Sequence, residues 1–217
     1  MAQFAVIGLG RFGAAAALEL VKMGHLVLGV DSDSKIADKY ADRLTRTVIA
    51  DVADSATVEE LGLEHYDVVL VAIGEAIQAS LLCVVHLKSL GIRNIWVKAS
   101  SHSHHLILNK LGVNRIIHPE EEMGLRIAQA LSYPMVNDYI PLGNGEFVVE
   151  IRVSEALDGK PLANVVKDDP TLPQALLIKH RSQAIVNPPD DHILHANDIL
   201  VMYGSLEALR ALAPRLI

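Results

Sequence analysis

The sequence has little cysteine, few aromatic residues and a deficit of basic charge. Its single cysteine, Cys83, excludes an internal disulfide and a multi-cysteine zinc site, and suits a reducing compartment. Aromatic residues make up 4% of the 217 residues, so the core must be built from Ala, Val, Leu and Ile. With 19 Lys and Arg against 26 Asp and Glu, the net charge is −7. A nucleic-acid partner needs a basic face to neutralise phosphates, so we expect none.

Long apolar runs are also missing. The longest, residues 68–74, is far shorter than the ~20 residues needed to span a bilayer. The first residues lack the basic and then apolar pattern of a secretory leader. We therefore expect no membrane segment of its own. Apolar residues still form 51% of the chain, which is enough for a buried core.

Residues 1–135 alternate between short apolar runs and helical stretches. The predicted strands are 4–7, 26–30, 47–49, 68–72, 95–98 and 115–117, and the predicted helices are 14–23, 37–44, 57–61, 76–90, 104–111 and 119–131. Strands that are apolar throughout and separated by helices indicate a parallel sheet covered on both faces. The first domain is therefore predicted to be a Rossmann-like, doubly wound α/β fold.

The pattern changes near Tyr133-Pro134, and residues 136–217 form the second predicted domain. Strands are expected at 146–153, 175–180 and 199–203, with a closing helix at 206–212. This is a small α+β domain of about 80 residues, close to the lower limit for a self-sufficient core. We expect it to pack against a second copy of itself.

Residues 8–13 read Gly-Leu-Gly-Arg-Phe-Gly, a GxGxxG loop between a predicted strand and a predicted helix. Gly8 would make the tight turn, Gly10 would admit a pyrophosphate, and Gly13 would let the helix pack closely. Asp31, at the end of the second strand, could accept hydrogen bonds from ribose hydroxyls and would repel a 2′-phosphate. Arg11 would suit a nucleotide with more negative charge, such as ATP, but a surface arginine is an equally good interpretation.

Further candidates lie where ligands bind in such folds, beyond the carboxyl ends of the strands. The full set of candidate cofactor-binding residues is Gly8, Gly10, Arg11, Phe12, Gly13, Asp31, Ser32, Asp51, Val52, Ile73, Gly74 and Lys98. For Asp51, a turn-forming helix cap remains an alternative. The sequence has no GxxxxGK[ST], GxSxG or HExxH motif, so P-loop hydrolysis is not indicated.

Two polar clusters could hold metals. His102, His104 and His105 lack the i, i+4 spacing of helical metal pairs, so a solvated helix start is the favoured interpretation. In His-Pro-Glu-Glu-Glu-Met-Gly, residues 118–124, proline at the first helical position and three acids predict a helix start. The same acids also make an oxygen-rich site for Mg²⁺ or Ca²⁺.

Five segments together resemble one known family. They are GLGRFG with Asp31, VAIG at 71–74, NIWVKA at 94–99, RIIHPEEEMG at 115–124 and ANDILVMYGS at 196–205. The chain resembles the RCK (KTN) domains of the TrkA family, in particular the cytosolic regulatory subunits of Ktr-type potassium-uptake systems. This resemblance implies an RCK N-terminal lobe and a C-terminal lobe. It also implies a non-enzymatic subunit whose dimers form an octameric gating ring at the inner face of the membrane, under a potassium transporter.

The resemblance implies roles for single residues as well. ATP or ADP would bind with its phosphates on the glycine loop. The ring would adopt different conformations with ATP and with ADP, and no hydrolysis would be needed. Asp31 would hold the ribose and Asp51 would lie near the adenine. Arg11 would reach a terminal phosphate bound in the adjacent subunit, and Glu120 would bind Mg²⁺ or Ca²⁺ at the dimer interface. Some relatives bind cyclic di-AMP between paired C-terminal lobes, and the corresponding stretch here is around Val165, Val166, His180 and Pro188. The alternative is that the second domain serves only for dimerisation.

Three other functions share parts of this pattern. An NAD(H)-dependent oxidoreductase has the same glycine loop and aspartate, but the second domain offers no acid–base pair for hydride transfer. An NAD-sensing regulatory subunit would keep the regulatory role with another effector. A transcriptional redox sensor would need a DNA-binding element, which we do not find in the sequence.

Overall fold

The computed structural model describes residues 1–132, 136–166 and 173–212. The chain divides into two compact units, Met1–Glu121 and Glu122–Ile217. The change of pattern at Tyr133-Pro134, and with it the predicted domain boundary, lies outside the described residues. None of the helices in the described segments is long and apolar enough to cross a membrane.

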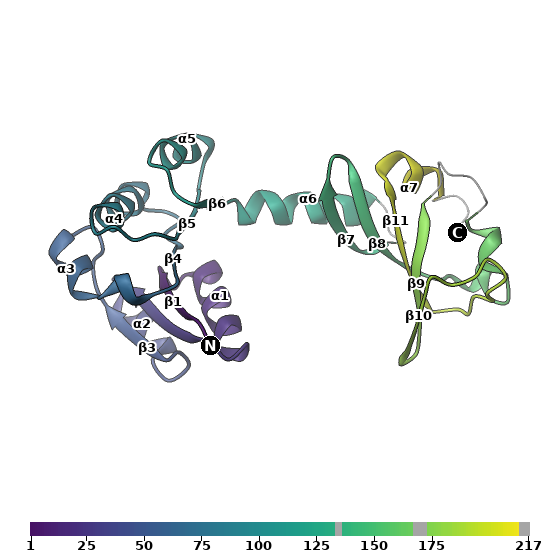
Figure 1. Ribbon diagram of the computed structural model, residues 1–217, viewed down its shortest axis with the longest axis horizontal. Coiled ribbons are helices and arrows are strands. Elements are labelled where there is room, and N and C mark those ends of the chain that lie inside the picture. The colour runs from purple at the N-terminus through teal and green to yellow at the C-terminus, as the bar shows by residue number, and fades with distance from the viewer. Residues whose placement is uncertain (133–135, 167–172, 213–217) are drawn as a thin grey trace. The chain divides into compact units, whose positions relative to one another are not determined.

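The first unit is built on a six-stranded parallel sheet (Figure 1). Its strands are β1 (Gln3–Ile7), β2 (Leu26–Asp31), β3 (Arg46–Ile49), β4 (Val68–Val71), β5 (Ile95–Lys98) and β6 (Arg115–Ile117). They lie in the order β3-β2-β1-β4-β5-β6, and every neighbouring pair is parallel. This is the Rossmann strand order. From β1 the chain first adds strands on one side of the sheet and then, from β4 onward, on the other side. The predicted fold class is confirmed.

Helices cover both faces of this sheet. They are α1 (Arg11–Lys22), α2 (Ser34–Tyr40), α3 (Ser55–Glu60), α4 (Ile77–Ser89) and α5 (His102–Lys110), with a 3₁₀ turn at Leu63–His65. Helix α6 (Pro119–Ser132) follows β6, and most of its residues belong to the second unit. Ala5 and Ile7 of β1 belong to one core, which includes residues of α3, α4 and α5. Val6 belongs to another core, with Ala17 of α1. Alternate residues of one strand thus feed two cores, as a doubly wound sheet requires.

Helices α1, α2, α3 and α5 begin two or three residues earlier than predicted, and in α2 and α3 the overlooked signal is an aspartate at the N-cap. The helix predicted at 37–44 is α2, Ser34–Tyr40. Asp33 caps it by accepting a hydrogen bond from the backbone N–H of Lys35 at 2.8 Å. In α3, Asp54 accepts one from the N–H of Thr57 at 3.2 Å, so this helix also begins earlier than predicted. Aspartate is a favoured N-cap because its carboxylate satisfies an otherwise unpaired backbone N–H.

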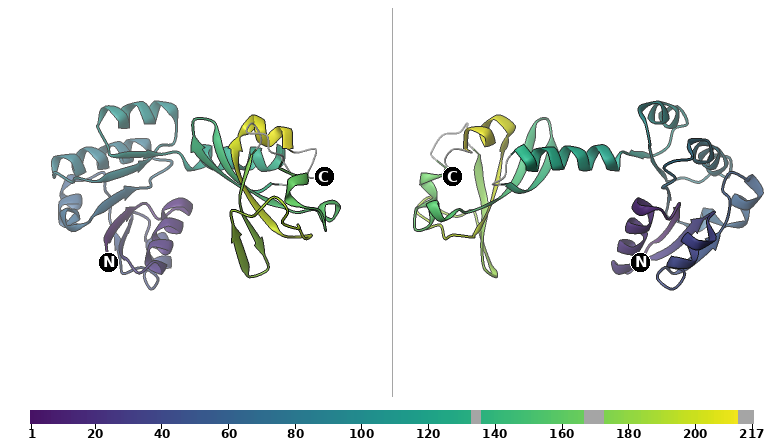
Figure 2. Two further views of the ribbon diagram at one scale, coloured as in Figure 1. Left: turned by 45° about the vertical axis from the view of Figure 1, so that its right-hand side comes forward. Right: turned by 180° about the vertical axis from the view of Figure 1, so that it is seen from behind.

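The second unit contains a five-stranded sheet in the order β10-β9-β11-β8-β7, with antiparallel neighbours. Its elements are β7 (Val136–Gly143), β8 (Glu146–Arg152), β9 (Gln174–His180), β10 (Gln183–Val186), β11 (Ile199–Ser205) and α7 (Leu206–Leu212), with 3₁₀ turns at Glu155–Leu157 and Leu162–Asn164. Figure 2 shows β9 and β10 as a hairpin at one edge of this sheet.

The sequence predicted β8, β9, β11 and α7 but missed both edge strands. Strand β7 contains Pro141, which lacks a backbone N–H, and its Ile140 and Leu142 are about half exposed. Strand β10 has only four residues, none of them buried. Edge strands bury fewer side chains, so they leave a weaker apolar alternation in the sequence.

The first prediction concerns the third glycine of the loop. A Cβ atom at Gly13 would overlap the carbonyl oxygen of Gly8, so Gly13→Ala should destabilise the first unit by about 1–3 kcal/mol. Urea-induced unfolding measures this loss. The matched control is Gly10→Ala, because a Cβ there meets no atom within 4 Å, and its cost should stay below about 1 kcal/mol. Equal losses in both variants would contradict this account of the loop.

Candidate functional site

The glycine loop connects β1 to α1 and brings two backbone segments very close. Gly8 has a φ of +92°, which favours glycine, and its N–H donates to the carbonyl oxygen of Val30 at 2.7 Å. Gly13 must also lack a side chain, because α1 packs directly on the loop. Around Gly10 there is open space. Gly8 and Gly13 therefore shape the loop, while Gly10 leaves its backbone free for a ligand to approach.

Asp31 ties this loop to the end of β2. Its Oδ2 accepts a hydrogen bond from the N–H of Leu9 at 2.7 Å, and its Oδ1 accepts one from the N–H of Asp33 at 3.0 Å. Each carboxylate oxygen can accept a further bond, so the side chain remains able to bind ribose hydroxyls. Asp31 thus combines a structural contact with the ligand role that the sequence predicts for it.

A cavity of about 370 Å³ opens at the carboxyl ends of β1, β2 and β4, where ligands bind in this fold. Its predicted lining residues are Gly8, Gly10, Asp31, Ser32, Asp51, Val52, Ile73 and Gly74. The sequence analysis missed the other lining residues, of which Glu75 and Ala76 directly follow the predicted Gly74; the rest are Ile7, Val30, Ile36, Ala50, Ala72 and Ala79. The Oδ1 of Asp51 accepts the N–H of Ala53 at 3.0 Å, so its turn-forming role is also realised.

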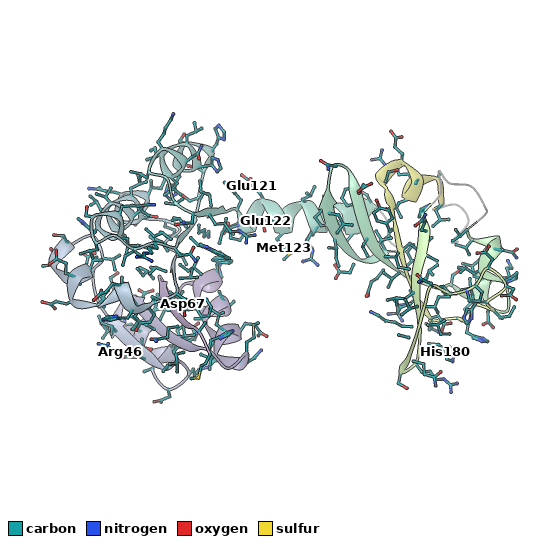
Figure 3. The ribbon with its side chains drawn as sticks, viewed as in Figure 1. Arg46, Asp67, Glu121, Glu122, Met123 and His180 are labelled. Carbon is teal, nitrogen blue, oxygen red and sulfur yellow. The ribbon has the colours of Figure 1, made fainter. Side chains whose placement is uncertain are left out.

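A second cavity of about 310 Å³ adjoins the first, since Gly74 and Glu75 line both. Its other lining residues are Arg11, Lys98, Ala99, Ser100, His118, Glu120 and Glu121. Glu121 is labelled in Figure 3 at the start of α6. The cavity combines two permanent cations with carboxylates, so it can take both a phosphate group and a divalent cation.

The second cavity contains an ion pair between two of its lining residues. Lys98 Nζ donates to Glu120 Oε1 at 2.6 Å, and the lysine side chain is only 13% exposed. This hydrogen bond is the main cause of a lowered pKa for Glu120, and the charge of Arg11 acts in the same direction. Without a ligand, Lys98 and Glu120 neutralise each other. Phe12, by contrast, packs against the α1 side of the core and lines neither cavity.

The histidines are arranged differently from the predicted solvated helix start. That prediction was wrong for His104, which is 1% exposed, and burial lowers its pKa. His105 Nδ1 lies 2.8 Å from His118 Nε2, a contact between distant segments that helical spacing cannot reveal. Among the described residues, no group of three or more His, Cys, Asp or Glu side chains is suited to a metal.

The four residues associated with cyclic di-AMP do not form an exposed apolar patch within one chain. Val165 is fully buried in the core of the second unit, and Val166 packs against that core. Pro188 is buried, and His180 is half-buried.

The sheet order, the glycine loop and the adjoining crevice define a Rossmann-type nucleotide-binding protein. Residues 4–119 match the TrkA-N domain, and the chain belongs to the TrkA family of Ktr-type potassium-uptake proteins.

Three relatives carry this assignment. Ktr system potassium uptake protein A of Bacillus subtilis (strain 168) is 42% identical over 93% of this chain and 91% of the relative. Ktr system potassium uptake protein C of the same organism is 38% identical over 94% of this chain and 92% of the relative. Protein A of Vibrio alginolyticus is 35% identical over 95% and 94%. The predicted family is confirmed.

Solved structures agree on the fold. The GsuK RCK domain superposes with a TM-score of 0.67 at 14% identity, covering 99% of this chain. The GsuK channel bound to NAD superposes with a TM-score of 0.57 at 18% identity, covering the whole of this chain. The chain spans less than half of those structures, 47% and 38% respectively.

The second prediction tests the Lys98–Glu120 pair. Because Lys98 stabilises the charged carboxylate, Lys98→Met should raise the pKa of Glu120 toward its ordinary value. Carbon-detected NMR titration of the glutamate side chains, without divalent cations, measures this shift. The control Lys22→Met breaks the exposed Lys22–Glu19 pair and should leave Glu120 unchanged. An unaltered Glu120 titration in Lys98→Met would argue against the pair in solution.

Proposed function

We propose that the chain is a non-enzymatic regulatory subunit that binds ATP or ADP and controls a membrane potassium-uptake transporter. The observation that carries this proposal is the continuity of the two cavities at Gly74 and Glu75. One cavity has the aspartate and glycine loop for an adenosine half and its first phosphates. The other has the cations for a further phosphate. The relatives, named as potassium uptake proteins, supply the class of partner.

ATP and ADP would differ at the second cavity. Adenosine would lie with its ribose on Asp31 and its adenine near Asp51, and the phosphates would cross Gly10 at the start of α1. Only ATP has a terminal phosphate for Arg11 and Lys98, and in a dimer Arg11 would reach the phosphate of the adjacent subunit. A ligand shifts an equilibrium only by its difference in affinity for the two states, so hydrolysis is not required.

Glu120 would bind Mg²⁺ or Ca²⁺ only after losing its present partner. A phosphate group would compete for Lys98, which now holds Glu120 at 2.6 Å. The freed carboxylate would then face a cation brought by the phosphates. Since no three-ligand metal group exists among the described residues, the remaining oxygens must come from phosphate, water and a second subunit. This requirement is consistent with a site at a dimer interface.

We further propose that dimers assemble into an octameric ring, attached from the cytoplasm to the transporter at the inner membrane face. Helix α6 offers a surface for assembly. Its Met123, Leu125, Ile127 and Leu131 are 53%, 55%, 53% and 77% exposed. Met123, Ile127 and Leu131 follow one another at i, i+4 spacing and so share one face of the helix. Exposed apolar residues on one face are typical of an interaction surface. Binding of cyclic di-AMP by the second unit stays a prediction from the resemblance.

An NAD(H)-binding regulator or an NAD-dependent oxidoreductase remains the alternative. Asp31 and the glycine loop are equally suited to NAD, and a GsuK channel has been solved bound to NAD. The second cavity favours ATP, because NAD has no terminal phosphate for the Lys98 and Arg11 cations.

The test is a binding titration of the purified chain with ATP, ADP, NAD⁺ and NADH, each with and without Mg²⁺. We expect micromolar binding of ATP and ADP, Mg²⁺-dependence for ATP alone, and no release of phosphate. Tight binding of NADH alone would contradict the proposal and favour a redox-linked function on the same fold.

The third prediction separates the terminal phosphate from the rest of the nucleotide. Arg11→Ala should weaken ATP binding about tenfold or more and leave ADP binding largely intact, because a charge-assisted hydrogen bond is lost. Calorimetric titration of both nucleotides measures the difference. Arg46→Ala is the control, since Arg46 is an exposed arginine on the edge strand β3 and lines neither cavity. Equal loss of both nucleotides in Arg11→Ala would show that the assigned role is wrong.

A further inference from the structure

The second unit contains a buried carboxylate that holds a histidine ring in place. Asp198 is 3% exposed, and its Oδ1 lies 2.7 Å from Nδ1 of His180, the last residue of β9. An ionised carboxylate only accepts hydrogen bonds, so Nδ1 of His180 carries the proton. This tautomer leaves Nε2 of His180 with a free lone pair. His180 is labelled in Figure 3.

A second histidine, His195, lies beside the first and has a longer contact with a carboxylate of its own. The ring of His195 lies with its centroid 5.0 Å from that of His180, at an angle of 57°. Its Nδ1 is 3.8 Å from Asp158 Oδ1, and its backbone N–H donates to Asp198 Oδ2 at 3.1 Å. Asp198 therefore positions both histidines, one through its ring and one through its backbone.

Both rings remain available to a ligand. Their side chains are 34% and 54% exposed, and neither Nε2 has a hydrogen-bond partner among the described residues. The other close histidine pair is different, because His105 and His118 bond to each other through ring nitrogens at 2.8 Å. In that pair one ring nitrogen of each histidine is used in the contact between the rings, whereas His180 and His195 have no hydrogen bond between their rings in the described part of the chain.

We propose that His180 and His195 form a binding site for a divalent transition-metal ion, of the kind that prefers imidazole ligands, with Zn²⁺ as the probe. Metal-binding histidines typically donate their second ring nitrogen to a carboxylate, as His180 does. Two imidazoles on one tetrahedral ion, with Zn–N distances of about 2.0–2.1 Å, have centroids about 5 Å apart. The observed centroid separation of 5.0 Å is compatible with this geometry. The His105–His118 rings have the same separation, so the contact of His180 with Asp198 is what distinguishes the proposed site.

Water completes the coordination in this site, because the described residues contain no group of three or more suitable side chains. The site would link the end of β9 to the turn before β11. In the metal-free chain these two segments are linked by the hydrogen bonds of Asp198 to His180 and His195. A bound ion would therefore stabilise this part of the second unit. The proposal is independent of nucleotide binding in the first unit.

The experiment is a Zn²⁺ titration of the full chain, freed of metal by a chelator, in competition with a chromophoric zinc indicator at neutral pH. We expect the unmodified chain to bind one equivalent of Zn²⁺. The affinity for this ion should fall at least tenfold in both His180→Gln and His195→Gln. The His195 side chain is exposed, so this variant should fold even if His180→Gln does not. Asp198→Asn should weaken binding without removing a ligand.

His65→Gln is the matched control, because His65 is an exposed histidine in the first unit with Nε2 3.4 Å from Glu64. It should bind Zn²⁺ as the unmodified chain does. Retention of every zinc equivalent in His195→Gln would overturn the proposal. So would loss of the zinc equivalent in His105→Gln alone, which would place the ion at the other histidine pair.

Discussion

The hydrogen bond from the N–H of Leu9 to Asp31 is the contact on which the nucleotide crevice depends. It joins the glycine loop after β1 to the end of β2, and so sets the width of the cavity between them. The close packing of Gly13 on Gly8 fixes the other side of the loop. A carboxylate that already holds the loop in place needs little rearrangement to accept a ribose, and such pre-organisation reduces the cost of binding.

Regulation in this account rests on an exchange of charge partners at the adjoining cavity. Lys98 and Glu120 are paired without a ligand, and the lowered pKa of Glu120 reflects that pairing. Under the proposed function, a terminal phosphate would compete for Lys98 and leave Glu120 for a cation. The nucleotide would thereby change the charge presented at the start of α6, on which Met123, Ile127 and Leu131 are exposed. Such a switch works by differential binding and involves no bond cleavage.

The sequence was sufficient for the sheet and for most of the crevice, and the limits have physical causes. Apolar strand runs and the spacing from Gly13 to Asp31 depend on local sequence, so they could be interpreted directly. Helix α2 was misplaced because the cap at Asp33 was overlooked, and β7 and β10 were missed because edge strands are weakly patterned. The pairs Lys98–Glu120 and His180–Asp198 join residues 22 and 18 positions apart, so only the folded chain reveals them.

The most direct test of the central claim is the structure of the full chain crystallised with ATP and Mg²⁺. The account predicts ribose hydroxyls on Asp31, phosphates over Gly10, and a terminal phosphate in contact with Lys98, with the Lys98–Glu120 pair broken. A terminal phosphate directed away from the second cavity, with Lys98 still bound to Glu120, would contradict it.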